Sequence, residues 1–412
     1  MRSSGKIAFI GIGLFDEPTG ISRAIQLMAE YFGPRAVIIV DNLQALRTHP
    51  IANGLVFVVN SPGLKLFIRR RLVREPLKLL DQYVRMTASI FKILSYQEIK
   101  RICCNTSVQF ALLSPILFGI RAFSPGMKIT LIAYDPVEPA WCRKHPLARL
   151  LLWSGLASDI ITVDMSMRGL LVKLTKRTPV HNVDFGVSAE LVRLAEQTKD
   201  SISDRVGSDL LASLSRDMKF VILLFYGRVL ERRRLEDLIL AFATLRTRAN
   251  PKDVILYVGG YTTSDLPYIR TLKALAAGLG CLGKVRFVGS LTTDELAYLY
   301  HSCDIFIFPA VDQPWGIAPL EAMIFGKPVI VTDECGLSRV LRPRKLAIIT
   351  RGRDPEDLAG KIRFLVEHED ARRALGGAGR DFVKLHMTFK NTGAQLEGIW
   401  QGLDCLEGQR FT

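Results

Sequence analysis

The sequence has few features of the kind that cross-link a chain or anchor it in a membrane. Its seven cysteines are scattered, with no Cys-x-x-Cys pair and no grouping with histidine. Neither a disulfide framework nor a zinc site is therefore expected, and reduced, buried thiols are the expected state. The apolar runs are shorter than the roughly 20 residues of a membrane-spanning helix. The longest, Phe110 to Ile120, is interrupted by Ser114 and Pro115, so we expect a buried helix there.

Acidic residues are scarce relative to basic ones. The formal net charge is +15, and residues 61–128 alone carry twelve basic side chains against three acids. Such a segment suits an anionic membrane surface or nucleic acid. Nucleic acid is the less favoured partner, because aromatic interleaving, zinc-finger spacing and an RNA-binding sheet signature are all missing. The start of the chain leads directly into an apolar strand at Ile7, so no secretory signal is expected.

A dinucleotide-binding fingerprint is incomplete. Gly11 and Gly13 follow the first apolar run, but the third glycine of the Gly-x-Gly-x-x-Gly pattern is missing. Asp16 and Glu17 would also place carboxylates where a pyrophosphate would sit. The two glycines are therefore interpreted as a tight strand end.

What the sequence does contain is a regular alternation of strands and helices. The 412 residues, 49% apolar and 23% charged, suit a globular protein of two domains. Short apolar strands separated by helical patterns are typical of a parallel sheet covered on both faces. The expected strands are residues 7–12, 37–40, 55–59, 99–103, 129–133, 160–163, 220–226, 254–258, 285–288, 305–308, 329–332 and 346–350. In the first half, helices are expected at 21–32, 64–84, 107–118, 147–156 and 167–174.

The polar stretch Glu196–Asp217 lacks apolar periodicity and is the expected boundary between the domains. The predicted fold class is α/β, with two doubly wound, Rossmann-like parallel-sheet domains. The predicted extents are 1–205 and 206–387, followed by a terminal segment, 388–412. A ligand would bind at the carboxyl ends of the strands, between the domains.

The most informative segment runs from Asp312 to Gly336. It follows an apolar strand and is expected to enter a helix that starts near Pro319 and stops at Gly326. The amides of Gly316 and Ile317 would then lie at a helix N-terminus, which suits an anion such as a diphosphate. Gln313 before that terminus and Glu321 in its first turn could face the same small volume. This combination suits a nucleotide sugar.

A second cluster follows the strand that ends at Tyr226. Gly227 and Arg228 come directly after it, and Glu231 to Arg234 precede a helix. Guanidinium groups in a loop at the carboxyl end of a strand can clamp phosphate. The alternative interpretation is a solvated basic loop.

The two clusters together resemble retaining glycosyltransferases of family 4, which have the GT-B fold of two domains facing across a cleft. Gln313 and Glu321 take the two positions of that family's E-x7-E signature, with Gln replacing the first Glu. The resemblance implies that Gln313 approaches the donor sugar and Glu321 binds the ribose. It also implies that Arg228 and Arg233 hold the donor diphosphate, with Arg234 at a position where the family has glycine.

Further stretches extend this resemblance over about residues 220–335. Gly259 ends a strand similar to the family's LxxVGxG motif, and Val288 lies in a VxFxG-like strand that would contact the base. In the first half, Gly20 opens a helix after the first strand and would face the cleft. Tyr134 and Asp135 follow a strand where related enzymes often have a His-Asp pair, and they are candidates for the acceptor side.

The family resemblance implies transfer of a sugar from a UDP- or GDP-sugar, with retention, to a lipid-linked or saccharide acceptor. Residues 1–205 would bind the acceptor, 206–387 the donor, and the last helix would cross back to the first domain. Since the chain has no Asp-x-Asp sequence, no metal and no cofactor are expected. The basic segment 61–128 would place the protein peripherally on the inner, cytoplasmic face of the cell membrane. The alternative function is a non-catalytic nucleotide-sugar-binding protein, to which Gln313 and Tyr134 both point.

Overall fold

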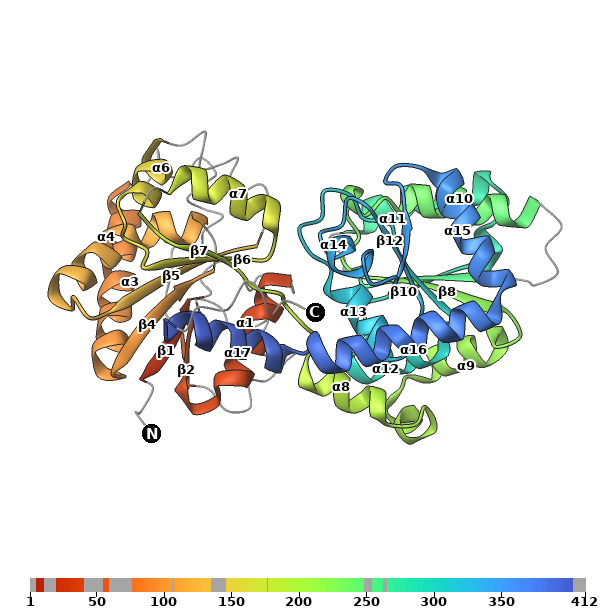
Figure 1. Ribbon diagram of the computed structural model, residues 1–412, viewed down its shortest axis with the longest axis horizontal. Helices are drawn as coiled ribbons and strands as arrows, with labels where there is room; N and C mark the ends of the chain where they lie inside the picture. Colours follow the sequence, from red (N-terminus) through yellow and green to blue (C-terminus); the bar gives the residue numbers. More distant parts are fainter. Residues whose placement is uncertain are drawn as a thin grey trace. The chain divides into compact units, whose positions relative to one another are not determined.

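The computed structural model describes residues 5–10, 20–40, 55–58, 76–105, 107–134, 146–175, 177–247, 254–261 and 265–402. The contacts divide the chain into two compact units. Unit 1 comprises Met1–Asp184 and Thr392–Thr412, and unit 2 comprises Phe185–Asn391 (Figure 1). Residues 185–205, which precede or open the polar stretch expected at the boundary, thus pack with unit 2. Within it, the His301 ring lies 3.2 Å from the Leu194 carbonyl oxygen.

Unit 1 is built on a parallel sheet of seven strands in the order β3-β2-β1-β4-β5-β6-β7. The sequence predicted six of these strands. The seventh, β7, has three residues, which is too few for a visible pattern. The strands are β1 (Lys6–Ile10), β2 (Ala36–Val40), β3 (Leu55–Val58), β4 (Ile99–Cys104), β5 (Lys128–Ala133), β6 (Asp159–Thr162) and β7 (Val180–Asn182).

The helices of unit 1 cover both faces of this sheet. The prediction of a helix at 64–84 is wrong at its carboxyl end, because α3 continues to Tyr96. The added turns bury Met86, Ile90 and Leu94, which lie on one side of the helix. Residues 64–75 of that prediction lie outside the described residues. The helices are α1 (Gly20–Phe32), α3 (Pro76–Tyr96), α4 (Ser107–Phe123), α6 (Pro146–Trp153), α7 (Met165–Leu174) and α17 (Phe389–Trp400).

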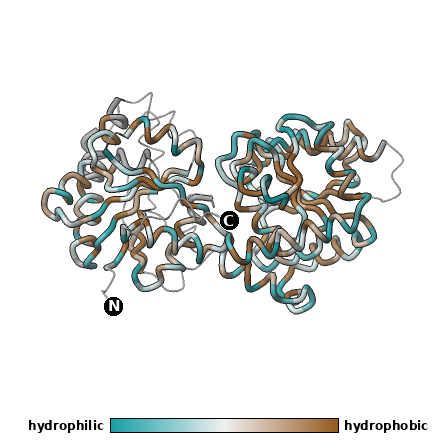
Figure 2. Tube along the Cα trace, in the orientation of Figure 1, coloured by the Kyte–Doolittle hydropathy of each residue, from teal (hydrophilic) through white to brown (hydrophobic). Residues whose placement is uncertain are grey.

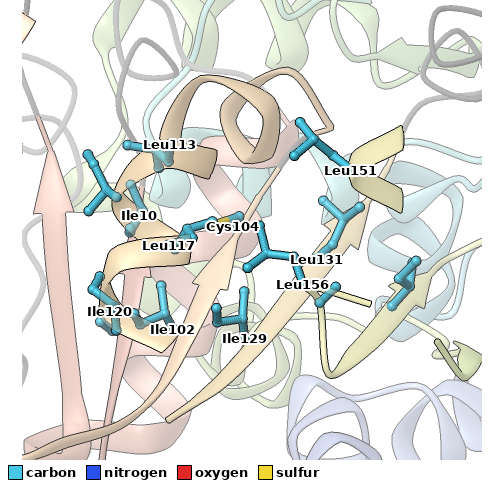
Figure 3. Close-up of a cluster of buried hydrophobic side chains, with 14 of the residues drawn as sticks. Ile10, Ile102, Cys104, Leu113, Leu117, Ile120, Ile129, Leu131, Leu151 and Leu156 are labelled. Atoms are coloured by element: carbon cyan, nitrogen blue, oxygen red, sulfur yellow. The ribbon is translucent and has the colours of Figure 1, made fainter. Parts of the chain in front are cut away.

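Alternation along the strands assigns each side chain of the sheet to one face. One face packs on α3, α4, α6 and α7 through a single hydrophobic cluster that includes Leu117, Leu131 and Leu151 (Figure 3). On the other face, Phe9 packs on Phe32 of α1 with ring centroids 5.8 Å apart. The Phe32 ring in turn stacks on Trp400 of α17 at 5.5 Å. The last helix therefore completes the core of unit 1.

Unit 2 has a parallel sheet of six strands in the order β10-β9-β8-β11-β12-β13. All six strands predicted from the sequence are present. They are β8 (Val221–Tyr226), β9 (Val254–Gly259), β10 (Val285–Gly289), β11 (Ile305–Phe308), β12 (Val329–Thr332) and β13 (Ile348–Thr350). The helices are α8 (Ala189–Glu196), α9 (Ser208–Asp217), α10 (Leu235–Thr247), α11 (Leu266–Gly278), α12 (Thr293–Ser302), α13 (Ile317–Ile324), α14 (Ser338–Leu341), α15 (Pro355–Glu367) and α16 (Glu369–His386).

Hydrophobic residues concentrate in the strands of both units (Figure 2). The five cysteines that the structure describes, Cys103, Cys104, Cys281, Cys303 and Cys335, are free and buried, as the sequence predicted. Burial raises the pKa of the Cys335 thiol to about 11, so it stays protonated. Among the described residues, no helix is long and apolar enough to span a bilayer.

Candidate functional site

The strand order of unit 2 creates a topological switch point between β8 and β11. In open α/β sheets, ligands bind outside the carboxyl ends of the strands at such a point. The loop after β8 contains Arg228 and Arg233, and the loop after β11 contains Gln313. The two loops are joined directly, because the Val311 amide donates to the Arg232 carbonyl at 2.9 Å. The switch point therefore brings together the two clusters that the sequence singled out.

Glycines bring the ends of β8, β9 and β10 into close backbone contact. The Gly227 amide donates to the Gly259 carbonyl at 3.2 Å, and the Gly260 amide donates to the Gly289 carbonyl at 2.6 Å. Gly260 has φ of +89°, and a Cβ there would lie 2.6 Å from the Gly227 carbonyl oxygen. A Cβ on Gly259 would lie 2.9 Å from Val288 Cγ2. The predicted residues Gly227, Gly259 and Val288 are thus neighbours at one edge of the sheet.

The Gly260→Ala substitution tests this close approach. The new methyl group would collide with the backbone of Gly227, so we expect a loss of about 1–3 kcal/mol in stability and at least about tenfold weaker nucleotide binding. Chemical denaturation and calorimetric titration measure the two effects. Gly283→Ala is the matched control, since a Cβ there meets no atom within 4 Å. Equal behaviour of the two variants would contradict the interpretation.

Arg233 and Arg234 are adjacent in sequence but point to different partners. Arg233 donates from Nη1 to Gln313 Oε1 at 2.6 Å, and its guanidinium carbon lies 4.9 Å from the centre of the Phe308 ring. Arg234 instead forms two 2.8 Å hydrogen bonds with the Asp237 carboxylate. Its φ of +52° is in the left-handed region, which explains why glycine would also suit this position. Only Arg233 of the two is therefore directed to the switch point.

The loop that carries Gln313 is held from several sides. Asp312 has φ of +48°, and its carboxylate accepts from Arg353 Nη2 at 2.8 Å. The Gly336 amide donates to the Gln313 carbonyl at 2.8 Å, and Trp315 Nε1 donates to the Phe185 carbonyl at 2.8 Å. These bonds fix the position from which the Gln313 side chain extends.

Helix α13 begins directly after this loop. Its N-cap is Gly316 and its first residue is Ile317, two residues earlier than the expected start at Pro319. Proline is compatible with the first turn of a helix, where its missing N–H is not needed. Since Gly316 has no side chain to accept from the first amides, the Gly316–Ile317 end can receive an anion, assisted by the helix dipole.

Glu321 is held by a buried tyrosine of α12. Tyr300 is fully buried, and its hydroxyl donates to Glu321 Oε2 at 3.1 Å. Burial and the Glu321 carboxylate raise the pKa of Tyr300 well above its usual value, so the phenol remains a donor. Sequence reasoning missed Tyr300, which lies 21 positions before Glu321 on a different helix.

The acceptor-side candidates lie in unit 1. Gly20 opens α1 as expected. Tyr134 follows β5, and its hydroxyl donates to Asn105 Oδ1 at 3.3 Å. Asn105 is fully buried after β4 and donates from Nδ2 to the Ile10 carbonyl at 2.9 Å, which joins the strand ends at the switch point of this sheet. Asn105 was missed, since the strand predicted at 99–103 ends two residues before it, whereas β4 continues to Cys104. Asp135 lies outside the described residues.

Comparison with known proteins adds to this geometry. The chain aligns over 97% of its length with the crystal structure of Anabaena Alr3699/HepE in complex with UDP, with a TM-score of 0.74, 17% identity and 100% of that chain covered. For sucrose-phosphate synthase from Thermosynechococcus elongatus, the TM-score is 0.73 at 17% identity, with 97% and 99% of the two chains covered. The chain has the GT-B fold.

Two matches at the level of sequence add to the structural comparison. Residues 209–382, within unit 2, match the family described as "Glycosyl transferases group 1". A "GDP-mannose-dependent alpha-(1-6)-phosphatidylinositol monomannoside mannosyltransferase" from Mycobacterium tuberculosis is 24% identical over 347 residues, 81% of this chain and 84% of that protein. These findings support a glycosyltransferase. Within the described part of the chain, no group of three or more His, Cys, Asp and Glu residues could hold a metal ion.

Proposed function

We propose that this GT-B protein transfers a sugar from a UDP- or GDP-sugar to a lipid-linked or saccharide acceptor in polysaccharide or glycoconjugate biosynthesis. The observation that carries the proposal is the hydrogen bond between Arg233 and Gln313. It lies at the switch point of unit 2, and Gln313 is in the loop that leads to the N-terminus of α13. The proposal includes both uracil and guanine as the base of the donor, because the mycobacterial relative is named for GDP-mannose and the Anabaena structure contains UDP. A lipid-linked acceptor is supported by the same relative's name, which specifies a phosphatidylinositol mannoside.

The chemistry follows from where the charges lie. When the bond between the sugar and the diphosphate breaks, negative charge grows on the departing phosphate oxygens. Arg228, Arg233 and the amides of Gly316 and Ile317 would neutralise this charge without a metal ion. Glu321, oriented by Tyr300, would accept hydrogen bonds from the ribose, and Gly227, Gly259 and Val288 would line the base side. Gln313 would contact the sugar.

Family 4 membership and retention of the anomeric configuration are parts of the proposal that rest on the E-x7-E-like spacing of Gln313 and Glu321. Unit 1 would bind the acceptor near Gly20, Tyr134 and Asp135. The basic segment 61–128, of which residues 61–75 lie outside the described residues, would hold the protein on the inner face of the cell membrane.

Calorimetric titration with UDP and, separately, GDP tests the donor site. We expect one nucleotide to bind saturably and Glu321→Ala to weaken that binding by about 10–100-fold, since hydrogen bonds to a charged group contribute about 1.5–3 kcal/mol. Glu397→Ala is the control, because this partly buried carboxylate also accepts from a tyrosine but pairs with Arg35 in unit 1. A folded protein that binds neither nucleotide would refute the proposal.

The uncharged Gln313 favours a second candidate, a protein that binds a nucleotide sugar without transferring it. The same titration combined with a turnover assay separates the two functions. The assay contains phosphoinositide and saccharide acceptors. If the protein binds a UDP- or GDP-sugar but releases no free nucleotide diphosphate, the result favours the non-catalytic binding protein.

A further inference from the structure

Large exposed apolar side chains are concentrated on four helices of unit 1. Among the described residues of unit 2, six side chains of this kind are exposed. Leu266, Leu279 and Leu282 belong to α11 and the turn after it, and Met218, Phe364 and Leu385 belong to separate elements. In unit 1, by contrast, eight of them belong to α3, α4, α6 and α7. They are Val84, Phe91, Phe118, Phe123, Leu150, Trp153, Met165 and Val172. We call these eight side chains and the helix surfaces between them the outer helical face.

The four helices lie on the same side of the sheet, since their inner residues join one hydrophobic cluster. In Figure 1 they follow one another across the sheet of unit 1. On α3, Val84 and Phe91 are seven residues apart and therefore lie in one stripe, opposite the buried Met86 and Ile90. On α4, Phe118 is 47% exposed although its neighbour Leu117 is buried. The exposed side chains thus lie on the solvent side of the helical layer that covers one face of the sheet.

The charge of this face is positive. The cations Arg85, Lys92, Arg121, Lys173 and Arg177 are exposed on or beside the same helices. The guanidinium carbon of Arg177 lies 5.7 Å from the Trp153 ring centre. Of the acids whose side chains are described between residues 84 and 177, Asp159 and Asp164 are buried and only Glu98 is exposed. The helices of this face therefore expose apolar groups together with cations, and their described side chains include little opposing charge.

Three kinds of partner could cover such a face. A second copy of the same face is opposed by repulsion between like charges. Nucleic acid would use the cations but would leave the aliphatic Val84, Leu150 and Val172 without a role. An anionic bilayer uses both components, because apolar and aromatic side chains enter the interface while Lys and Arg meet the headgroups.

We propose that the outer helical face is a docking surface for an anionic lipid bilayer, with Phe91, Phe118 and Trp153 entering the interface. This face includes α6 and α7 and so extends beyond the basic segment 61–128. The inference rests on the proposed function for its purpose, which is to bring unit 1 to an acceptor in the membrane. Docking itself involves only residues of unit 1 and is measured without sugar transfer.

Vesicle flotation with the full chain tests the docking. We expect binding to phosphatidylcholine vesicles that contain phosphatidylglycerol, and much weaker binding to phosphatidylcholine alone. The double variant Phe91→Ser/Phe118→Ser should lower the partition coefficient at least about tenfold, because each ring loses burial in the interface. Met218→Ser/Leu385→Ser is the matched control, with side chains that are 65% and 67% exposed in unit 2.

Two further measurements separate insertion from charge alone and keep the test independent of folding defects. In the unmutated protein, brominated lipids should quench a fluorescence component that Trp153→Phe removes. UDP or GDP binding by the Phe91→Ser/Phe118→Ser variant should equal that of the unmutated protein, so a failed donor site and a failed docking surface give different results. Equal binding to neutral and anionic vesicles, full retention by the double variant, or no quenching at Trp153 would overturn the proposal.

Discussion

Replacing Arg233 with alanine is expected to lower kcat/KM for the nucleotide sugar by about 10²–10³-fold, the effect of losing one preorganised donor to a developing anion. The adjacent Arg234→Ala should change kcat/KM less than about threefold, because Arg234 is committed to Asp237. Release of the free nucleotide diphosphate measures both variants. The contrast is sharp because the two side chains are chemically identical and one position apart.

The uncharged side chain of Gln313 is one reason to expect a large effect of Arg233→Ala. An arginine can only donate, so the oxygen of the Gln313 amide faces Arg233 and its nitrogen remains a donor. A glutamate at this position would pair with Arg233 and neutralise it, whereas glutamine leaves the full positive charge for a diphosphate. If Arg233→Ala and Arg234→Ala lost activity equally, a loop-wide structural effect would be the better explanation, and the assignment of Arg233 as the clamp would fail.

The second large effect concerns stability. Asp159→Ala is expected to cost about 3–5 kcal/mol of unfolding free energy, because it leaves a buried guanidinium without its counter-charge. Arg101 Nη1 lies 2.5 Å from Asp159 Oδ2, and both side chains are 10% exposed. Thr130 donates to the same carboxylate at 2.7 Å, and the Trp400 ring centre is 4.8 Å from the Arg101 guanidinium carbon. Denaturant titration of the full chain measures the loss.

Glu196→Ala is the control for this experiment. The Glu196–Lys384 pair has a similar separation of 2.6 Å, but its side chains are 56% and 57% exposed. An exposed pair contributes about 0–1 kcal/mol, so this variant should be close to the unmutated protein. Losses of similar size in the two variants would show that burial does not determine the importance of the Arg101–Asp159 pair.

Most of the fold could be predicted from sequence because strands buried on both faces appear as short, continuous apolar runs. Of the thirteen strands that the described residues form, twelve were identified in this way. Exceptions have physical reasons. Strand β7 is too short for a pattern, and α3 was ended early because the polar residues after Val84 obscured the buried side formed by Met86, Ile90 and Leu94. Helix boundaries depend on tertiary packing that local propensity does not contain.

The candidate site was predictable only in part. The loop after β8, with Arg228 and Arg233, and the segment after β11, with Gln313 before α13 and Glu321 within it, were identified, since each follows a strand and leads into a helix. The resemblance assigned the diphosphate to Arg233 and not to Arg234, and the contacts give a physical reason that sequence does not contain, since Arg234 has a left-handed backbone and pairs with Asp237. Tyr300 and Asn105 reach their partners from other elements, so only the three-dimensional arrangement assigns them a role.

The terminal helix α17 has a consequence for the order in which the protein forms during synthesis. Unit 2 is one continuous stretch, Phe185–Asn391, and can fold as soon as that stretch has left the ribosome. Unit 1 emerges first but has to wait for Trp400, which packs against Phe32 across most of the chain. Until then, the face of the sheet that packs on Phe32 is covered by α1 without α17, so part of its apolar surface stays exposed to chaperones. The half of the molecule that is made first is thus completed last.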